Sequence, residues 1–136
     1  MTEGNRQRNI ELEVEKGQAS LKAAELCLQA SLWDDAVSRA YYGALHFVQA
    51  LLLTAGLEAR SHHGVHDLFF LHFVRPGTVS ARVSKLFAGL QKYREEADYA
   101  RAFRFSEQGA REEVANALEI RDEVKKLLVK DGWTAP

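Results

Sequence analysis

The sequence has little of several features on which whole classes of protein depend. Its single cysteine, Cys27, cannot form an internal disulfide, which excludes a scaffold held by disulfide bridges. No apolar run approaches the roughly 18 residues that span a bilayer. Residues 1–9 are polar and lack the apolar segment of a secretory signal. We therefore expect a cytoplasmic protein that is not embedded in a membrane.

Prolines and β-branched residues are also scarce. Only Pro76 and Pro136 occur, and the 136 residues include 19 Ala, 17 Leu and 13 Glu against 10 Val, 2 Ile and 4 Thr. Straight-chain helix formers dominate, which favours helices over strands. The length fits one domain, expected over residues 1–136 with its core at about 10–130.

An excess of charge of one sign is missing as well. The formal net charge is −1, which excludes a strongly basic nucleic-acid binder at the level of the whole chain. Basic residues nevertheless gather between Arg75 and Arg111, a stretch with eight basic and four acidic side chains. This stretch is either a locally basic surface or a mixed, solvated face.

Apolar periodicity and stop signals divide the chain into helices. The spacing predicts helices over about 6–31, 36–55, 65–74, 79–93 and 110–127, with a bend near 97–106. Asp34 is expected to cap the second helix and Ser106 the last one, while Arg75-Pro76-Gly77 marks a stop. Together these elements predict an all-α, antiparallel up-and-down four-helix bundle with one additional short helix.

The second predicted helix carries the most informative side chains. Arg39 and His46 are seven residues apart, so they lie about 20° apart around the helix axis, on one face. Gly43 and Ala50 continue that face, and Gly43 costs about 1 kcal/mol relative to Ala inside a helix. Because such a glycine often permits close approach of another backbone, the face is predicted to be a contact surface. The structural alternative pairs Arg39 with Asp35 and leaves His46 satisfied at an interface.

The residues around this face resemble a known family. The segment Arg-Ala-Tyr-Tyr-Gly-Ala-Leu-His, from Arg39 to His46, resembles the Arg-x(4–6)-His signature of HEPN domains, and more closely that of small stand-alone bacterial and archaeal HEPN proteins. Residues 61–65 resemble the family's His-containing stretch. Residues 73–77 resemble its Phe-Val-x-x-Gly turn, and residues 94–99 its Arg-x-x-Ala-Asp-Tyr element. The resemblance covers roughly residues 15–130.

The resemblance implies a bundle that dimerises and, in many members, a metal-independent endoribonuclease site where the Arg and His of two subunits meet. On that basis Arg39 and His46 are the expected catalytic residues, Gly43 and Ala50 lie on the expected homodimer face, and no cofactor is expected. The resemblance further implies a toxin that acts on RNA and has a minimal nucleotidyltransferase as antitoxin. The alternative is a non-catalytic module that binds a nucleotide or partners such a nucleotidyltransferase.

One position departs from the family. In one subfamily the partner modifies a Tyr two residues after the motif His, whereas this chain has Val48 there. The resemblance therefore does not extend to this form of regulation.

The residue types suit the implied chemistry. A histidine exchanges protons near neutral pH, and the planar fork of an arginine matches phosphate oxygens. Four further residues are candidate supporting groups: Tyr42, His62, Arg94 and Asp98. Each has a structural alternative, namely ring packing for Tyr42, a helix cap for His62 and an Arg94–Asp98 pair at the bend.

A second cluster of histidines raises the question of a metal site. His62, His63 and His66 have helical spacing and Asp67 is adjacent, a pattern that can bind zinc. No Cys lies nearby and no Glu is placed as in His-Glu-x-x-His, so we expect no metal at these residues.

Overall fold

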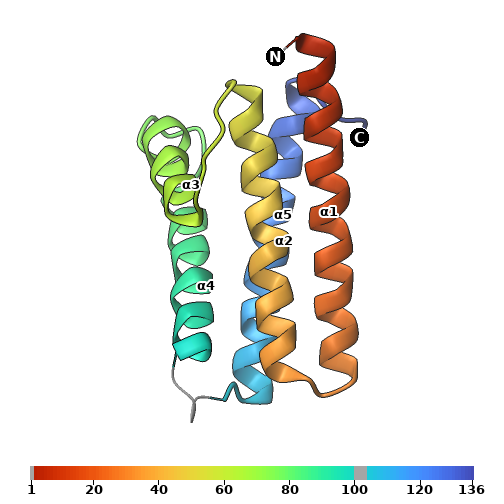
Figure 1. Cartoon of the computed structure of the whole chain (residues 1–136), viewed down its shortest axis with the longest axis vertical. Helices are drawn as coiled ribbons and strands as arrows, with labels where there is room; N and C mark the ends of the chain where they lie inside the picture. Colours follow the sequence, from red (N-terminus) through yellow and green to blue (C-terminus); the bar gives the residue numbers. More distant parts are fainter. Residues whose placement is uncertain (1, 100–103) are drawn as a thin grey trace.

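The structure, a computed structural model, describes the backbone of residues 2–99 and 104–136 and the side chains of residues 2–96 and 104–136. Over this part of the chain it contains α1 (Glu3–Gln29), α2 (Trp33–Thr54), α3 (His62–Phe69), a π-helical segment η1 (Phe70–Val74), α4 (Ala81–Tyr99) and α5 (Glu107–Lys130), and no strand. The four long helices run alternately up and down, with α3 beside one end of the bundle (Figure 1). The predicted all-α bundle with one additional short helix is therefore confirmed.

Local signals set most of the helix ends. The hydroxyls of Thr2, Ser61 and Ser106 accept hydrogen bonds from the backbone N–H three residues on and so cap α1, α3 and α5. Gly77 follows the predicted stop at Pro76 and adopts a left-handed conformation with φ of 88°. The prediction that Ser106 caps the last helix is thus confirmed.

The predicted cap of the second helix is wrong. Helix α2 begins one residue earlier than Asp34, after Leu32, which makes no side-chain capping bond. The Asp34 carboxylate instead accepts a hydrogen bond of 2.8 Å from the backbone N–H of Phe105 and lies 3.7 Å from Arg104. Asp34 therefore makes a tertiary contact with the residues just before α5 instead of capping its own helix. The spacing of residues in the sequence does not reveal such a contact.

Helix α2 is the centre of the molecule. It contacts α1, α3, α4 and α5, and most of its side chains are buried. The largest fully buried side chains of the core include Tyr41 and Phe47 from α2 and Phe69 and Phe87 from the helices beside it. Because α2 contacts each of the other α-helices, a site at its exposed edge can use residues from several helices.

Gly43 and Ala50 do not lie on an exposed face, which corrects the prediction that they form the homodimer face. A Cβ atom added at Gly43 would lie 2.6 Å from Cδ2 of Leu21, and one added at Gly17 would lie 2.8 Å from the Phe47 ring. Ala50 is fully buried. The expected close approach of a second backbone is real, but that backbone is α1 of the same chain.

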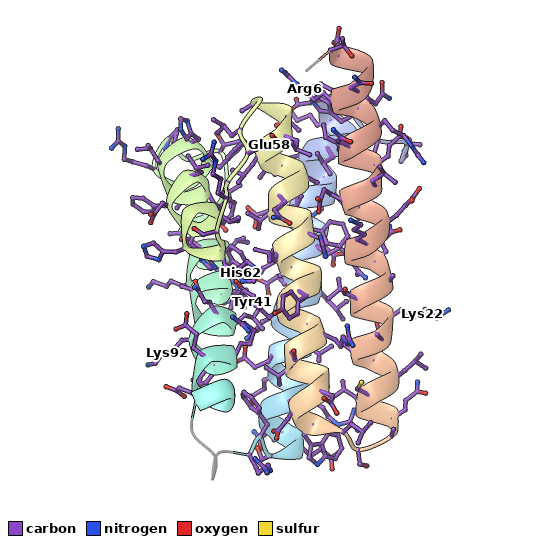
Figure 2. The ribbon with its side chains drawn as sticks, viewed as in Figure 1. Arg6, Lys22, Tyr41, Glu58, His62 and Lys92 are labelled. Carbon is purple, nitrogen blue, oxygen red and sulfur yellow. The ribbon has the colours of Figure 1, made fainter. Side chains whose placement is uncertain are left out.

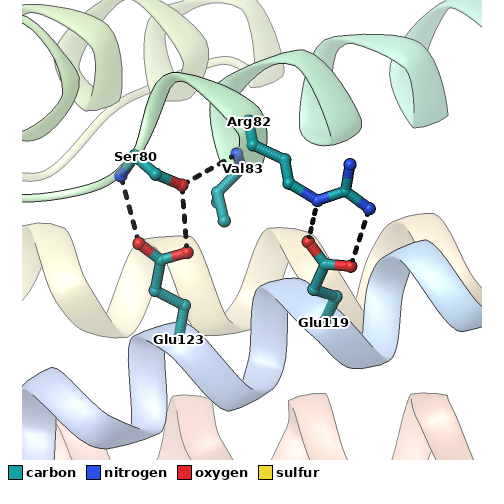
Figure 3. Close-up of polar contacts among 5 residues, drawn as sticks. All are labelled: Ser80, Arg82, Val83, Glu119 and Glu123. Atoms are coloured by element: carbon teal, nitrogen blue, oxygen red, sulfur yellow. Dashed lines mark hydrogen bonds and ion pairs between the residues drawn. The ribbon is translucent and has the colours of Figure 1, made fainter.

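The start of α4 is fastened to α5 by two carboxylates (Figure 3). Glu123 accepts hydrogen bonds from the backbone N–H and the hydroxyl of Ser80, at 3.1 and 3.2 Å. Glu119 accepts two bonds from the Arg82 guanidinium, at 2.6 and 3.0 Å. These contacts hold α4 in register with α5 and so fix where its later residues meet α2. No helix in the described part of the chain is long and apolar enough to cross a membrane.

Candidate functional site

The exposed edge of α2 carries both residues of the predicted catalytic pair. Arg39 is exposed and makes no ion pair with a described residue, so the structural alternative of an Arg39–Asp35 pair is not seen. His46 lies two turns further along, about 10 Å along the helix axis, with its side chain 24% exposed. Tyr42, rather than the buried Gly43, fills the partly exposed position between them.

His46 is held by a carboxylate from the neighbouring helix. Its Nδ1 atom lies 2.7 Å from Oε2 of Glu13 on α1, and the Glu13 side chain is also 24% exposed. A carboxylate only accepts hydrogen bonds, so Nδ1 carries the hydrogen and Nε2 remains for proton exchange. This contact defines both the tautomer and the orientation of the ring.

Sequence reasoning missed Glu13, although a signal for it existed. Glu13 lies between Ile10 and Gly17 at helical spacing, at the edge of the apolar stripe that packs α1 onto the bundle. A partly buried carboxylate at that edge is stabilised by a polar partner on the helix it faces. Which residue supplies the partner depends on the register of α1 against α2, which the tight Gly17–Gly43 contact sets.

Three of the four predicted supporting residues come together on the side of α2 that faces α3 and α4. The Arg94 guanidinium of α4 lies over the rings of Tyr41 and Tyr42, at 5.1 and 5.5 Å, and donates a hydrogen bond of 3.4 Å to the Tyr42 hydroxyl. The His62 ring of α3 lies 5.9 Å from Tyr42 and 6.0 Å from Tyr41. Figure 2 shows His62 and Tyr41 between α2 and the pair α3 and α4.

The structure describes the side chain of His62 but not that of Asp98. His62 opens α3 but does not cap it, because Ser61 supplies the capping oxygen. The side chain of Asp98 lies outside the residues whose side chains are described, and so does the predicted Arg94–Asp98 pair. The cluster of Tyr42, His62 and Arg94 is hereafter called the aromatic–arginine cluster.

A buried layer lies behind the aromatic–arginine cluster. Burial raises the pKa of Tyr41 to about 12, so its hydroxyl stays protonated. His66 stacks on Phe87 with ring centroids 3.9 Å apart. Burial, with help from the neighbouring His63 and His62, lowers the pKa of His66 to about 4. Both groups therefore support the cluster as uncharged side chains near neutral pH.

The histidines of α3 point in different directions. His66 packs into the core against Phe87, whereas His63 is largely exposed and lies 3.6 Å from Asp67. Within residues 2–96 and 104–136 no group of three or more His, Cys, Asp or Glu side chains is placed to hold a metal ion. The helical spacing of the histidines therefore does not bring them to one point.

The basic stretch from Arg75 to Arg111 is partly neutralised by its neighbours. Arg82 pairs with Glu119, Arg104 with Asp34, and Arg111 with Glu107. Two of these carboxylates come from outside the stretch, and sequence counting could not include them. A mixed, solvated surface describes these three arginines better than a continuous basic track does.

Comparison with known proteins relates the chain to one family and to several similar proteins. Residues 10–130 match the family described as HEPN domain. The chain is 33% identical over 119 residues to "Putative toxin MJ0605" of Methanocaldococcus jannaschii, covering 88% of each protein. It is 34% identical over 92 residues to "Putative toxin MJ0142" of the same organism, covering 68% of this chain and 63% of the relative. It is also 37% identical over 76 residues to "UPF0332 protein PH1297" of Pyrococcus horikoshii, covering 56% and 54%.

Proposed function

Because this chain belongs to the HEPN domain family, we propose that it is a toxin-like, metal-independent endoribonuclease in which Arg39 and His46 act on an RNA phosphate. The observation that carries the proposal is the His46–Glu13 pair at the edge of α2, with the exposed Arg39 on the same edge. An arginine that makes no ion pair with a described residue can bind phosphate oxygens, and a histidine of fixed orientation can transfer a proton, so both groups suit phosphate chemistry without a metal.

The proposed reaction transfers the phosphate within the RNA strand. The ribose 2′-oxygen attacks the adjacent phosphorus as its proton passes to a base, and the bond from phosphorus to the 5′-oxygen breaks as that oxygen takes a proton from an acid. The products are a 2′,3′-cyclic phosphate and a 5′-hydroxyl. His46 exchanges a proton through Nε2, while Arg39 binds the phosphate oxygens as negative charge builds up on them.

A complete reaction needs both an acid and a base, and one chain offers only one His46. We propose that a second copy supplies the other histidine in a two-fold dimer built around the exposed edge of α2. Since Gly43 and Ala50 are covered by α1, this dimer uses Arg39, Tyr42 and the rim of the aromatic–arginine cluster. His62 lies beside Tyr42 and is the supporting histidine within each chain.

A purified-protein assay tests the proposal. Wild type should cleave single-stranded RNA in EDTA and leave cyclic phosphate ends. His46→Ala should lose about 100-fold or more, the usual contribution of a proton-transfer group. Arg39→Lys should lose most of its activity as well, because an ammonium lacks the planar fork. His72→Ala and Arg75→Lys change exposed residues in η1 and directly after it, away from this edge, and serve as matched controls.

The outcomes separate the alternatives. Activity that vanishes in EDTA and returns with zinc would contradict the metal-free reaction. A folded chain that binds nucleotides and cleaves no RNA would support the alternative of a non-catalytic module.

The toxin assignment has its own test. Two relatives carry names that include the word toxin, so we propose that this chain, too, arrests growth unless an antitoxin, such as a minimal nucleotidyltransferase, neutralises it. Expression of the chain alone should stop growth and degrade RNA, whereas His46→Ala should permit growth. Growth that wild type leaves undisturbed at high expression would argue against a toxin.

A further inference from the structure

The layer formed by α3, η1 and α4 has an outer side that the proposed reaction does not use. Figure 1 shows this layer on the side of α2 opposite to α1. In α4, Phe87 is buried in the core and Arg94 lies over the tyrosine rings of α2. Lys85 and Lys92 each precede one of these residues by two positions, about 200° around the helix axis, so both lie on the outer side. Figure 2 shows Lys92 pointing away from α2.

This outer side carries cations that no carboxylate balances. Residues 68–94 contain no Asp or Glu. Within them Arg75, Lys85 and Lys92 are exposed and make no ion pair with any residue that the structure describes. The carboxylates of α5 that reach the start of α4 are already engaged, as Figure 3 shows. The outer side is therefore short of negative charge, which a partner can supply.

Two large apolar side chains are exposed in the same layer. Phe70 and Leu71 of η1 are 52% and 43% exposed, although Phe69 and Phe73 beside them are buried. The backbone N–H of Val79 donates a hydrogen bond of 2.9 Å to the carbonyl of Phe73, and η1 contacts α4. Exposed apolar side chains that gather among polar ones mark interaction sites. Five residues, hereafter called the basic–apolar surface, share this layer: Phe70, Leu71, Arg75, Lys85 and Lys92.

The outer stripe of α4 has the spacing that a second helix would match. Ala81, Lys85, Ala88 and Lys92 follow one another at steps of four and three residues, and all four are exposed. The two lysines lie two turns apart, about 10 Å along the axis, and carboxylates two turns apart on another helix have the same spacing. The short side chains of the two alanines leave room for that helix to lie along α4.

We infer that the basic–apolar surface binds an acidic amphipathic helix of a protein partner. The partner's carboxylates pair with Lys85 and Lys92, and its apolar side chains cover Phe70 and Leu71. RNA suits this surface less well, because Leu71 offers no flat ring on which a base can stack. The inference does not depend on RNA cleavage, since the two lysines lie on the face of α4 opposite to Arg94.

Two synthetic helical peptides of about 18 residues, roughly 27 Å long, test the inference by fluorescence anisotropy. Both carry leucines at one end of one face. They differ only in the side chains that follow two turns apart on that face, which are glutamates in one peptide and lysines in the other. Wild type should bind the glutamate peptide, with an affinity that falls as salt is added, and should not bind the lysine peptide.

Variants of the chain test each half of the surface. Lys85→Glu combined with Lys92→Glu should reverse the preference, so that the lysine peptide binds and the glutamate peptide does not. Phe70→Ser combined with Leu71→Ser should weaken binding of the glutamate peptide about tenfold or more without changing any charge. Lys126→Glu alters an exposed lysine of α5 and should bind as wild type does. Circular dichroism should show the same helix content in all variants.

The outcomes decide between a protein partner and the alternatives. A glutamate peptide that does not bind, or that both double variants bind as wild type does, would overturn the inference. Single-stranded RNA is the third probe in the same assay. RNA binding that Lys85→Glu with Lys92→Glu abolishes, in the absence of peptide binding, would assign the surface to nucleic acid instead.

Discussion

Among single residues, Glu13 has a defined effect, because its carboxylate holds the ring of His46 in one orientation. A histidine on an exposed helix edge rotates among several orientations, whereas this one is tied at 2.7 Å to a carboxylate on another helix. The carboxylate accepts the hydrogen on Nδ1 and so fixes the orientation of the ring. We therefore regard Glu13 as a positioning residue that acts through His46.

Exchange of Glu13 for its amide tests this role. Glu13→Gln keeps the shape of the side chain and removes the charge, so kcat for RNA cleavage should fall about tenfold or more while KM changes little. Circular dichroism should show an unchanged helix content. Glu15→Gln alters an exposed carboxylate on the same helix and provides the control. Equal kcat values for Glu13→Gln and wild type would show that the pair is structural only.

The lowered pKa of His66 predicts how the free energy of unfolding depends on pH. Burial against Phe87 lowers its pKa from 6.5 to about 4, so in this range the unfolded chain binds the proton more readily than the folded one. The stabilisation is therefore complete above about pH 6.5 and is lost as the pH falls towards 4. His66→Phe keeps a stacked ring without the titration, so its unfolding free energy should decline less over this range.

Urea denaturation at several pH values measures this effect. His72→Phe, in the neighbouring segment η1, is the matched control, since this exposed side chain does not contribute to the pKa shift of His66 and should leave the decline as it is in wild type. A decline in His66→Phe as steep as in wild type would assign the acid sensitivity to other groups.

At the scale of elements, the contact between α1 and α2 determines where the site residues lie. Gly17 and Gly43 let the two helices approach closely, and this register places Glu13 opposite His46. The sequence predicts a close contact at Gly43 from its cost inside a helix, but not whether the second helix belongs to the same chain. Only the folded chain shows that α1 takes that place.

Two glycine substitutions separate packing from helix propensity. Gly43→Ala would bring a Cβ to within 2.6 Å of the Leu21 side chain, so it should lower the free energy of unfolding by about 1–3 kcal/mol despite the better propensity of alanine. Gly89→Ala in α4 meets nothing within 4 Å and should raise it by about 0.5–1 kcal/mol. Chemical denaturation of both variants measures the difference. A Gly43→Ala variant as stable as Gly89→Ala would contradict the close contact.

The helices themselves could be predicted well, whereas several of their details could not. Apolar spacing follows from burial on one face, so it finds each long helix and the stop at Pro76. It does not reveal the π-helical turn of η1. Nor does it reveal the hydrogen bond between Asp34 and Phe105, because these two residues lie far apart in the sequence. Arg39 and His46 could be proposed from one helix, while Glu13 required the packing of two.

At the scale of the whole molecule, the bundle presents two groups of polar side chains on either side of one helix edge. Glu13 and His46 lie towards α1, and the aromatic–arginine cluster lies towards α3 and α4. The Ser80–Glu123 and Arg82–Glu119 contacts hold α4 against α5 and thereby keep Arg94 in place. Helices α1, α2 and α4 thus supply side chains around one edge of α2, and α5 supports them through α4. We propose that a second copy of the chain meets the first at this edge.

A dilution series tests the central claim of a metal-free site completed by two copies of the chain. Molecular mass by light scattering and RNA cleavage in EDTA are measured on the same samples, with His46→Ala in parallel. We predict that cleavage per chain falls in step with the fraction of dimer and is absent from His46→Ala at every concentration. Full cleavage by a monomer, or cleavage by His46→Ala equal to that of wild type, would contradict this account.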